Sequence, residues 1–313
     1  MPFAVVCASH TPLMRNGEID PAARRSVDTA FEGLAARIDR FAPELVIQFS
    51  PDHFNGFFYD LMPAFCLGVE ASAIGDWDTH AGPLDVPAEE AAALGAALID
   101  GGIDLAVSHR MVVDHGFTQV WEKMFGSARR VPIIPIFINS AAPPLPTFKR
   151  ARLLGEAAGR FAGTLNRRVL FAASGGLSHD PPFPDLATAP PDVRARLIDG
   201  RNPTREQRAA REDRVQAAGA AAARGEGPCL PLDPDWDRRV MSLLRDGDLA
   251  AFDAVNTSEV RAIAGRGGPE VLTWVAAHAA LAAAGPYETS FEFYLPVPGW
   301  VAGMGMTFGE SRA

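Results

Sequence analysis

Short runs of β-branched and aromatic residues alternate with longer alanine-rich segments over the first two thirds of the chain. Such runs are typical of buried strands, and their alternation with helical segments favours α/β units around a largely buried sheet. The expected strands are Phe3 to Cys7, Leu45 to Phe49, Phe65 to Val69, Leu105 to Val107, Ile133 to Ile138 and Val169 to Ala173. The expected helices between them are Pro21 to Arg40, Ala88 to Asp100, Gly116 to Met124 and Phe148 to Leu165.

The composition changes over residues 181–231, where Pro, Arg, Ala and Asp are frequent and large apolar residues are few. We interpret this segment as a polar helical insertion into a single domain that spans residues 1–313, with a helix over Arg205 to Arg224. A solvated insertion is favoured, and a lid over a binding site is the alternative. Helical patterning resumes at Trp236, and strand-like alternation follows over Phe291 to Phe308.

The charge balance excludes some classes of partner. The 313 residues include 29 Lys and Arg against 38 Asp and Glu, a formal net charge of -9. This balance argues against nucleic acid and against anionic membranes, because both attract clustered positive charge. Three widely spaced cysteines, Cys7, Cys66 and Cys229, indicate neither a disulfide framework nor a zinc ribbon. With no signal-peptide pattern and no apolar run long enough to span a bilayer, a cytoplasmic location is expected.

Three of the seven histidines closely follow expected strands. His10 lies three residues after the first strand, His53 four after the second and His179 six after the last. Because ligands bind outside the carboxyl ends of the strands in open α/β sheets, these side chains are expected to converge on one edge. His115, beside Asp114 in the sequence VVDHGF, could reach the same edge from a loop.

Imidazoles at a sheet edge bind metal or move protons, and two neutral imidazoles with one carboxylate form a ligand set typical of non-heme Fe(II). Glu270 is the candidate carboxylate, because it follows a Gly-Gly-Pro sequence at the start of an apolar helix over 271–284. An ordinary glutamate at a helix start is the alternative interpretation. Asp52 and Glu259 are rivals, although Asp52 is better suited to orient a neighbouring imidazole.

The remaining histidines have simpler interpretations. His80 and His109 stand in polar, loop-like sequence and are expected to be surface or structural residues. His278 lies within the apolar helix and is expected to be a hydrogen-bonded core histidine. The aromatic residues 57–59, close to His53, either line a pocket or pack in the core.

Five blocks of sequence resemble the class III extradiol ring-cleavage dioxygenases. They are SHTPL around His10, FSPDHFNGFFYDLMPAFCLGV around His53, VDHGF around His115, RVLFAASGGLSHDPP around His179, and AIAG followed by TWVAA near Glu270. The likeness covers nearly the whole chain and implies one catalytic α/β domain of the protocatechuate-dioxygenase B-subunit type, with a mixed sheet flanked by helices. It also implies an Fe(II) cofactor, catechol substrates cleaved with O2 beside their two hydroxyls, and assembly as a homo-oligomer.

Carried over position by position, the resemblance implies that His10, His53 and Glu270 bind the metal. It implies that His179 accepts a proton from the catechol and that His115 donates one. The implied substrate is 3-(2,3-dihydroxyphenyl)propanoate, with the cinnamate analogue also accepted, and the implied product is 2-hydroxy-6-oxonona-2,4-dienedioate. Residues 190–227 resemble the family least, which leaves their part in substrate choice open.

Two other classes of function remain possible at this point. A zinc-dependent hydrolase could use the same two histidines and one carboxylate, with His179 as the general base. A non-catalytic scaffold could keep the fold after its metal site had decayed. The expected histidine or glutamate fills each of the five positions that the resemblance singles out, which argues against decay.

Overall fold

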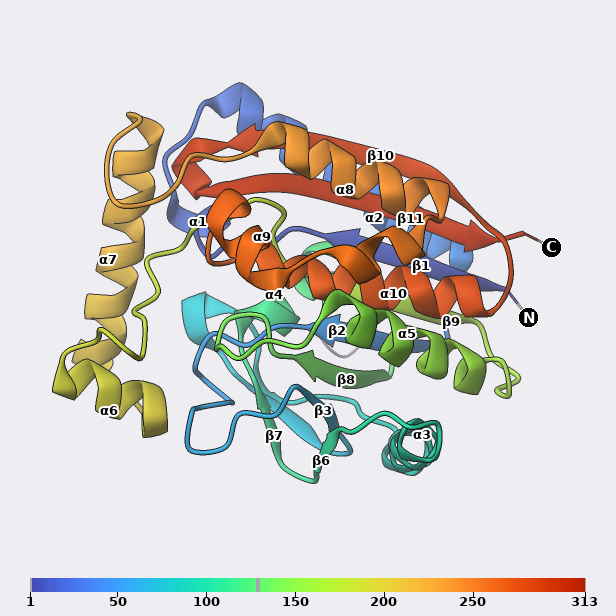
Figure 1. Cartoon of the computed structure of the whole chain (residues 1–313). Coiled ribbons are helices and arrows are strands. Elements are labelled where there is room, and N and C mark those ends of the chain that lie inside the picture. The colour runs from blue at the N-terminus through green and yellow to red at the C-terminus, as the bar shows by residue number, and fades with distance from the viewer. Residues whose placement is uncertain (1, 128–129, 313) are drawn as a thin grey trace.

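The computed structural model describes residues 2–127 and 130–312, which form a mixed sheet of eight strands with helices on both faces (Figure 1). The strand order in this sheet is β10-β11-β1-β9-β2-β8-β3-β6, and a smaller sheet has the order β5-β4-β7. The strands are β1 (Phe3–Ala8), β2 (Leu45–Ser50), β3 (Phe65–Gly68), β4 (Ala71–Ile74), β5 (Ala81–Pro83), β6 (Ala106–Ser108), β7 (Met111–Val113), β8 (Ile133–Ile138), β9 (Val169–Ser174), β10 (Tyr287–Val297) and β11 (Ala302–Ser311).

Ten α-helices and several short 3-10 turns occur in the same described residues. The helices are α1 (Leu13–Asn16), α2 (Pro21–Phe41), α3 (Ala88–Asp100), α4 (His115–Phe125), α5 (Phe148–Ala162), α6 (Pro191–Asp199), α7 (Arg205–Ala223), α8 (Pro234–Asp246), α9 (Thr257–Ala264) and α10 (Val271–Ala283). The 3-10 turns are η1 (Asp76–Asp78), η2 (Leu249–Ala254), η3 (Gly268–Glu270) and η4 (Pro298–Trp300).

The middle of the main sheet is parallel. Strands β1, β9, β2 and β8 run in one direction, and all their residues are buried. Parallel strands covered on both faces need apolar side chains on both faces, which explains why these strands are predominantly apolar. β11 pairs antiparallel with β1, and β3 pairs antiparallel with β8. The backbone N–H of Phe3 in β1 also donates to Ser311 Oγ in β11, at 3.0 Å across 308 positions of sequence.

Helices α5 and α10 pack on one face of the main sheet, and α2 and α4 pack on the other (Figure 1). α10 is buried over most of its length, so it needs no polar face. Its approach to α5 depends on two glycines of α5. A Cβ atom at Gly155 would lie 2.0 Å from Ala276 O, and one at Gly159 would lie 2.1 Å from Ala280 O. Residues with side chains would push the two helices apart.

The helices of the predicted insertion, α6 and α7, lie at the end of the main sheet to which the carboxyl ends of β1, β2 and β9 point. In Figure 1 this end is on the left, opposite the two chain termini. α7 starts with a capping box, in which the side chains of Thr204 and Gln207 each accept a hydrogen bond from the other's backbone N–H. Most of its residues are exposed, as its alternating charges predict.

The α/β prediction is confirmed, and the strands and helices expected in the first two thirds of the chain occur with small shifts at their ends. The sequence prediction missed β4, β5 and β7, which have only three or four residues each. Because β7 ends directly before Asp114, His115 reaches the sheet edge as the first residue of α4, where a loop was expected. No helix among residues 2–127 and 130–312 is long and apolar enough to cross a membrane.

Candidate active site

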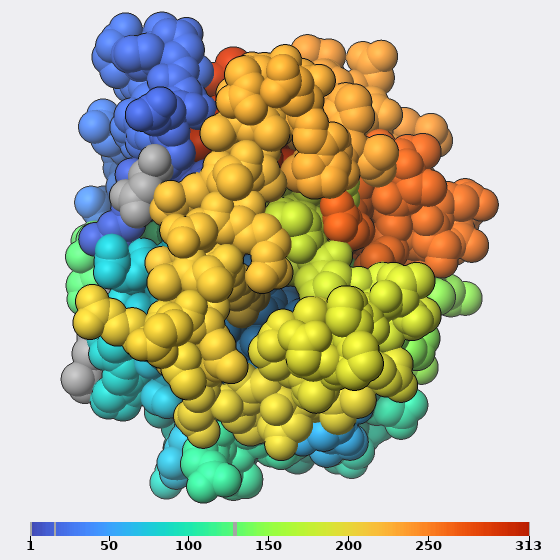
Figure 2. All heavy atoms as spheres, turned by 90° about the vertical axis from the view of Figure 1, so that its left-hand side faces the viewer, coloured from blue at the N-terminus to red at the C-terminus, as the bar shows by residue number. Residues whose placement is uncertain are grey.

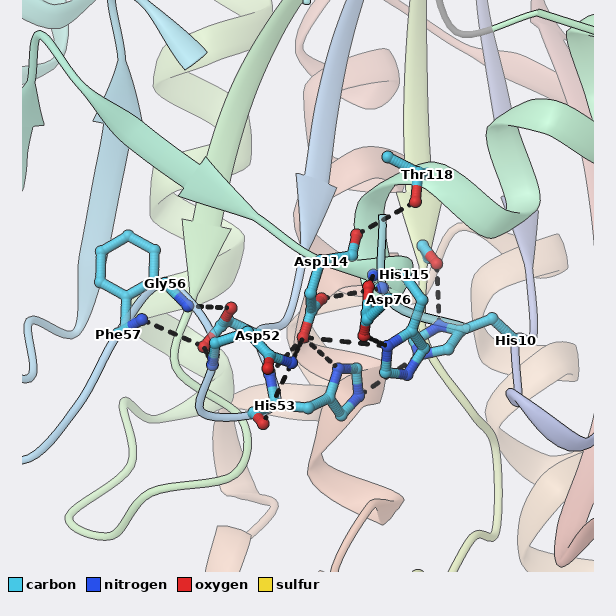
Figure 3. Close-up of polar contacts among 12 residues, drawn as sticks. His10, Asp52, His53, Gly56, Phe57, Asp76, Asp114, His115 and Thr118 are labelled. Carbon is cyan, nitrogen blue, oxygen red and sulfur yellow. Dashed lines mark hydrogen bonds and ion pairs between the residues drawn. The ribbon is translucent and has the colours of Figure 1, made fainter. Parts of the chain in front are cut away.

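Five buried side chains meet at the carboxyl ends of the central parallel strands. His10, His53 and His179 follow β1, β2 and β9, His115 begins α4, and Glu270 ends η3. None of them is more than 5% exposed. Figure 3 shows His10, His53 and His115 directed toward one another. The ring centroids of His53 and His115 lie 4.3 Å apart, and those of His10 and His53 lie 5.1 Å apart. The sheet therefore brings together residues that are far apart in the sequence.

The two ring nitrogens of His10 have different surroundings. Nδ1 pairs with Ser174 Oγ at 2.9 Å, and Nε2 lies 3.3 Å from His53 Nε2. Burial lowers the pKa of His10 well below its usual value, so the imidazole is neutral. A neutral imidazole whose Nδ1 is held by a hydroxyl can present the lone pair of Nε2 to a ligand.

Asp114 holds His53. Its Oδ2 accepts a hydrogen bond from the backbone N–H of His53 at 2.9 Å and another from Nδ1–H at 3.0 Å. Burial lowers the pKa of His53, but the carboxylates of Asp114 and Glu270 outweigh burial and raise this pKa well above its usual value. Because Nδ1 is occupied by Asp114, Nε2 is the nitrogen that faces His10.

The structure corrects the role that the sequence predicts for Asp52. The sequence favours Asp52 as the aspartate that orients an imidazole, but Asp114 makes that contact. Asp52 instead accepts three backbone hydrogen bonds from the loop that follows His53 (Figure 3). These donors are the N–H groups of Asn55, Gly56 and Phe57, at 2.9 to 3.1 Å. Asp52 therefore shapes the loop, because an adjacent aspartate can reach the backbone ahead of it more easily than its neighbour's ring.

Glu270 is fully buried, and its two oxygens differ. Oε2 accepts the backbone N–H of Gly176 at 2.7 Å. Oε1 has no hydrogen-bond partner among the described residues and lies 3.5 Å from His53 Nε2. Burial raises the pKa of Glu270, but the nearby imidazoles outweigh burial and lower it to about 2. Gly175, at φ +153°, permits this approach, since a Cβ there would lie 2.8 Å from Glu270 Cβ.

These residues fit a bound metal ion. An ionised carboxylate oxygen that is buried without a donor needs a cation, and Glu270 Oε1 is such an oxygen. The nearby His10 Nε2 and His53 Nε2 are 3.3 Å apart, and the second nitrogen of each ring is already held. Ring nitrogens of His10, His53 and His115 also lie within 4.8 Å of one another, so His115 is a geometric rival to Glu270 as the third ligand. The charge of the orphaned oxygen favours Glu270.

His115 is paired with a carboxylate that the sequence analysis missed. Asp76, in η1, accepts a hydrogen bond from His115 Nδ1–H at 2.6 Å and another from the backbone N–H of His115 at 2.8 Å (Figure 3). The two residues are 39 positions apart, and the intervening chain forms much of the small sheet. No local spacing signals this contact. The two contacts with Asp76 fix the orientation of the His115 ring.

His179 is paired with a carbonyl group. Its Nδ1 lies 2.5 Å from Val301 O, so Nδ1 carries the proton and donates to that oxygen. Burial lowers the pKa of His179, which leaves Nε2 unprotonated as an acceptor. Val301 has φ +54°, an unfavourable conformation for a β-branched residue, and its carbonyl is aimed at the histidine from the turn before β11. A cavity opens onto His53, His115 and His179 together.

The other candidates lie outside this cluster. Glu259 is exposed in the first turn of α9, so it cannot supply the buried carboxylate. His109 is exposed, and His80 is partly exposed. His278 is fully buried in α10, where Nδ1 pairs with Trp274 O at 3.0 Å, as expected for a core histidine.

Comparisons with known proteins agree with this site. Residues 4–305 match the family model described as "Catalytic LigB subunit of aromatic ring-opening dioxygenase". A Rhodococcus protein is 49% identical over 307 residues, covering 98% of each chain, and a Cupriavidus pinatubonensis protein is 48% identical over 315 residues, covering 100% of each. Both are named 2,3-dihydroxyphenylpropionate/2,3-dihydroxicinnamic acid 1,2-dioxygenase.

A crystal structure of an uncharacterized protein from Escherichia coli K12 shares the fold. It matches with a TM-score of 0.53 and 14% identity, over 99% of each chain. At this identity the similarity concerns the architecture alone. The family match, the full-length relatives and the histidine cluster agree with one another, and together they identify the protein as an extradiol dioxygenase that belongs to the family of catalytic LigB subunits of aromatic ring-opening dioxygenases.

Proposed function

We propose that the protein cleaves the ring of 3-(2,3-dihydroxyphenyl)propanoate with O2 to give 2-hydroxy-6-oxonona-2,4-dienedioate, and that it accepts the cinnamate analogue. The observation that carries this proposal is the identity of 48 to 49% along the whole chain to enzymes named for these two substrates. The family implies a metal cofactor, and we assign Fe(II) to it. Two imidazoles with one carboxylate leave open positions on Fe(II), which suits a site that takes both a catechol and O2.

His10, His53 and Glu270 are the proposed ligands. The close approach of the two histidine Nε2 atoms, 3.3 Å apart, and the orphaned Glu270 Oε1 support this choice. When bound there, Fe(II) supplies Lewis acidity to the catechol oxygens and electrons for O2 activation. Ser174 and Asp114 hold the Nδ1 atoms of the two histidines, so the ligand nitrogens are fixed before the metal arrives.

His179 and His115 are the proposed acid and base residues. His179 Nε2, unprotonated because Val301 O holds the proton on Nδ1, accepts the proton of a catechol hydroxyl. His115, whose Nδ1 is held by Asp76, donates a proton later in the reaction. Both rings border the cavity in which the substrate binds. The different partners of the two Nδ1 atoms support opposite roles for the two residues.

The test is oxygen uptake by protein loaded anaerobically with Fe(II). We expect one O2 consumed for each 3-(2,3-dihydroxyphenyl)propanoate and a yellow product whose colour depends on pH. Protein loaded with Zn(II) is the matched control and is expected to consume no O2. The proposal fails if no catechol supports uptake at full ferrous occupancy. Hydrolysis by the Zn(II) form would then favour the alternative of a zinc-dependent hydrolase.

We also propose that the enzyme works in the cytoplasm as a homo-oligomer. The free state of Cys7, Cys66 and Cys229 supports a reducing compartment, because Cys7 and Cys66 are buried without a disulfide. Light scattering after size-exclusion chromatography tests the assembly. A mass equal to that of one chain at micromolar concentration would contradict it.

A further inference from the structure

The helices of the insertion cover a second cavity beside the histidine cluster. Its volume is about 290 Å³, and its walls come from four parts of the chain: α6 and α7, the loop after β2, residues 74–77 of β4 and η1, and residues 181–184. Figure 2 shows the hollow between the yellow and amber segments of the insertion, with blue atoms from the early part of the chain on its floor. Aromatic side chains, Phe54, Phe58 and Trp77, provide much of its lining. We call it the outer cavity.

The outer cavity is continuous with the cavity over the histidines, which we call the inner cavity. The two share wall residues that belong to η1, to the chain after His179 and to α7. These are Trp77, Pro181, Pro182, Phe183, Arg211 and Val215. A ring held beside His53, His115 and His179 therefore has room for a side chain that extends toward α7.

Arg211 is the one lysine or arginine among the described residues that lines both cavities. Its Nη1 donates to Asn55 Oδ1 at 3.3 Å, and its Nη2 donates to the carbonyl oxygen of His53. No ion pair with an aspartate or glutamate is formed by Arg211 in residues 2–127 and 130–312. A half-buried guanidinium with neutral partners keeps its positive charge uncompensated and can bind a carboxylate.

Other arginines are less well placed for the inner cavity. Arg208 and Arg214, also on α7, are exposed and line only the outer cavity. Arg196 on α6 is paired with Asp192 at 3.0 Å. Most of the outer cavity's lining surface is apolar, although Asp76 and Glu212 also border it. At its boundary with the inner cavity, Arg211 is the arginine available to a carboxylate.

We infer that Arg211 binds the carboxylate of the acid side chain of the substrate, and that the insertion thereby selects catechols with an anionic side chain. This inference rests on the proposed function, because it takes a catechol with a carboxylate side chain as the substrate. It gives residues 181–231 a part in recognition, contributed by a residue on the inner side of an otherwise solvated helix. The planar guanidinium matches the two oxygens of a carboxylate, which a neutral side chain cannot replace.

The test compares 3-(2,3-dihydroxyphenyl)propanoate with 3-propylcatechol, a neutral substrate of similar length, in the Fe(II)-loaded enzyme. In Arg211→Gln the ratio of kcat/KM for the acid to kcat/KM for the neutral catechol is expected to fall about 10- to 100-fold, mostly through KM. Arg205→Gln, an exposed residue of the same helix outside both cavities, is the control with an unchanged ratio. If Arg211 had only a structural role, through its contact with the backbone of His53, its loss would lower kcat/KM for both substrates by the same factor. The ratio would then be unchanged.

A second measurement does not need the metal. Trp77 and Trp300 line the inner cavity, so titration of metal-free protein with 3-phenylpropanoate is expected to quench tryptophan fluorescence, and Arg211→Gln is expected to weaken this binding by a similar factor. Identical titration curves for wild type and variant would overturn the inference. An unchanged ratio of kcat/KM for the two substrates in Arg211→Gln would also overturn it. So would a fall in this ratio in Arg208→Gln but not in Arg211→Gln. If wild-type enzyme cleaves neither catechol, the proposed function itself is wrong.

Discussion

The histidines of the site differ in the group that holds Nδ1, and this difference gives identical side chains different chemistry. His115 faces the carboxylate of Asp76, whereas His179 faces the carbonyl of Val301. The carboxylate places a negative charge beside the His115 ring, whereas the carbonyl fixes a neutral tautomer of His179 without adding charge. The groups that hold Nδ1 are therefore the basis on which we propose that one histidine gives a proton and the other accepts one.

The first prediction concerns the third metal ligand. Glu270→Gln is expected to lose tight Fe(II) binding with little loss of stability, because the substitution keeps the shape but removes the charge of Oε1. His115→Gln is expected to keep its metal and lose activity. Iron content after dialysis, measured by a chelator assay, checks both. If Glu270→Gln retained its full iron content and His115→Gln lost its iron, the result would identify His115 as the third ligand.

The second prediction concerns His179. His179→Gln is expected to bind Fe(II) and substrate normally, since its ring nitrogens contact no proposed ligand. Turnover is expected to fall about 10²- to 10⁴-fold, the usual cost of losing a general acid or base. Single-turnover kinetics with pre-bound substrate measure this step. Wild-type turnover in the variant would show that His179 is a structural residue.

The sequence predicts the histidine cluster better than the partners of its members. His10, His53 and His179 could be found because each follows a buried strand, and strand ends meet at one edge. Asp76 and the carbonyl of Val301 could not, since one is distant in sequence and the other is a backbone group with no residue-type signal. Asp52 misled the prediction because sequence adjacency says little about which group a side chain reaches.

At the scale of elements, the strands predicted most accurately are those buried on both faces. β1, β2, β8 and β9 are predominantly apolar, with Gln48 as the one polar residue inside them, because the central part of a sheet covered by helices tolerates little else. β5 has only three residues, none of them buried, so it lacks the pattern on which the prediction depends.

The third prediction concerns the contact between α5 and α10. Gly155→Ala is expected to destabilise the fold by about 1 to 3 kcal/mol, because the new Cβ would lie 2.0 Å from the backbone oxygen of Ala276. Gly95→Ala in α3 is the matched control, because its nearest neighbour atom would lie at 3.6 Å. There the higher helix propensity of alanine is expected to stabilise the fold by up to about 1 kcal/mol. Urea unfolding measures both, and equal effects would contradict the close approach.

At the scale of the whole molecule, an ion pair between the buried Asp180 and the partly exposed Arg266 ties the insertion to the rest of the domain. Asp180 accepts hydrogen bonds from Arg266 Nε at 2.7 Å and Nη2 at 3.0 Å, and from the backbone N–H of Leu230 at 2.7 Å. The pair therefore joins both ends of the segment 181–231 to the loop between α9 and η3. Asp180 also follows His179 directly, so the same contacts steady the position of that histidine.

The fourth prediction follows from the pKa of Asp180. Burial raises this pKa, but Arg266 outweighs burial and lowers it below the usual value, so the carboxylate stabilises the fold above the pKa of the unfolded chain, about 3.9. Asp180→Asn is expected to cost about 1 to 3 kcal/mol at pH 7. The difference from wild type is expected to shrink as the pH falls from about 5 toward the lowered pKa.

Urea unfolding at a series of pH values measures this difference. The control is Asp235→Asn, which removes an exposed ion pair with Arg238 and is expected to change stability little at any pH. A penalty for Asp180→Asn that stays constant down to pH 3 would mean that the carboxylate charge contributes nothing.

The pairing of β1 with β11 has a consequence for synthesis on the ribosome. β9 covers one edge of β1 once residue 174 has emerged, but the other edge stays open until the β11 residues 302–311 follow. A nascent chain therefore carries an exposed, wholly apolar strand edge during most of its translation, and such edges invite pairing with other chains. The carbonyl of Val301 emerges just before β11, so His179 acquires its fixed tautomer only in the same late step. The closure of this strand edge and the completion of the active site thus depend on the same part of the chain.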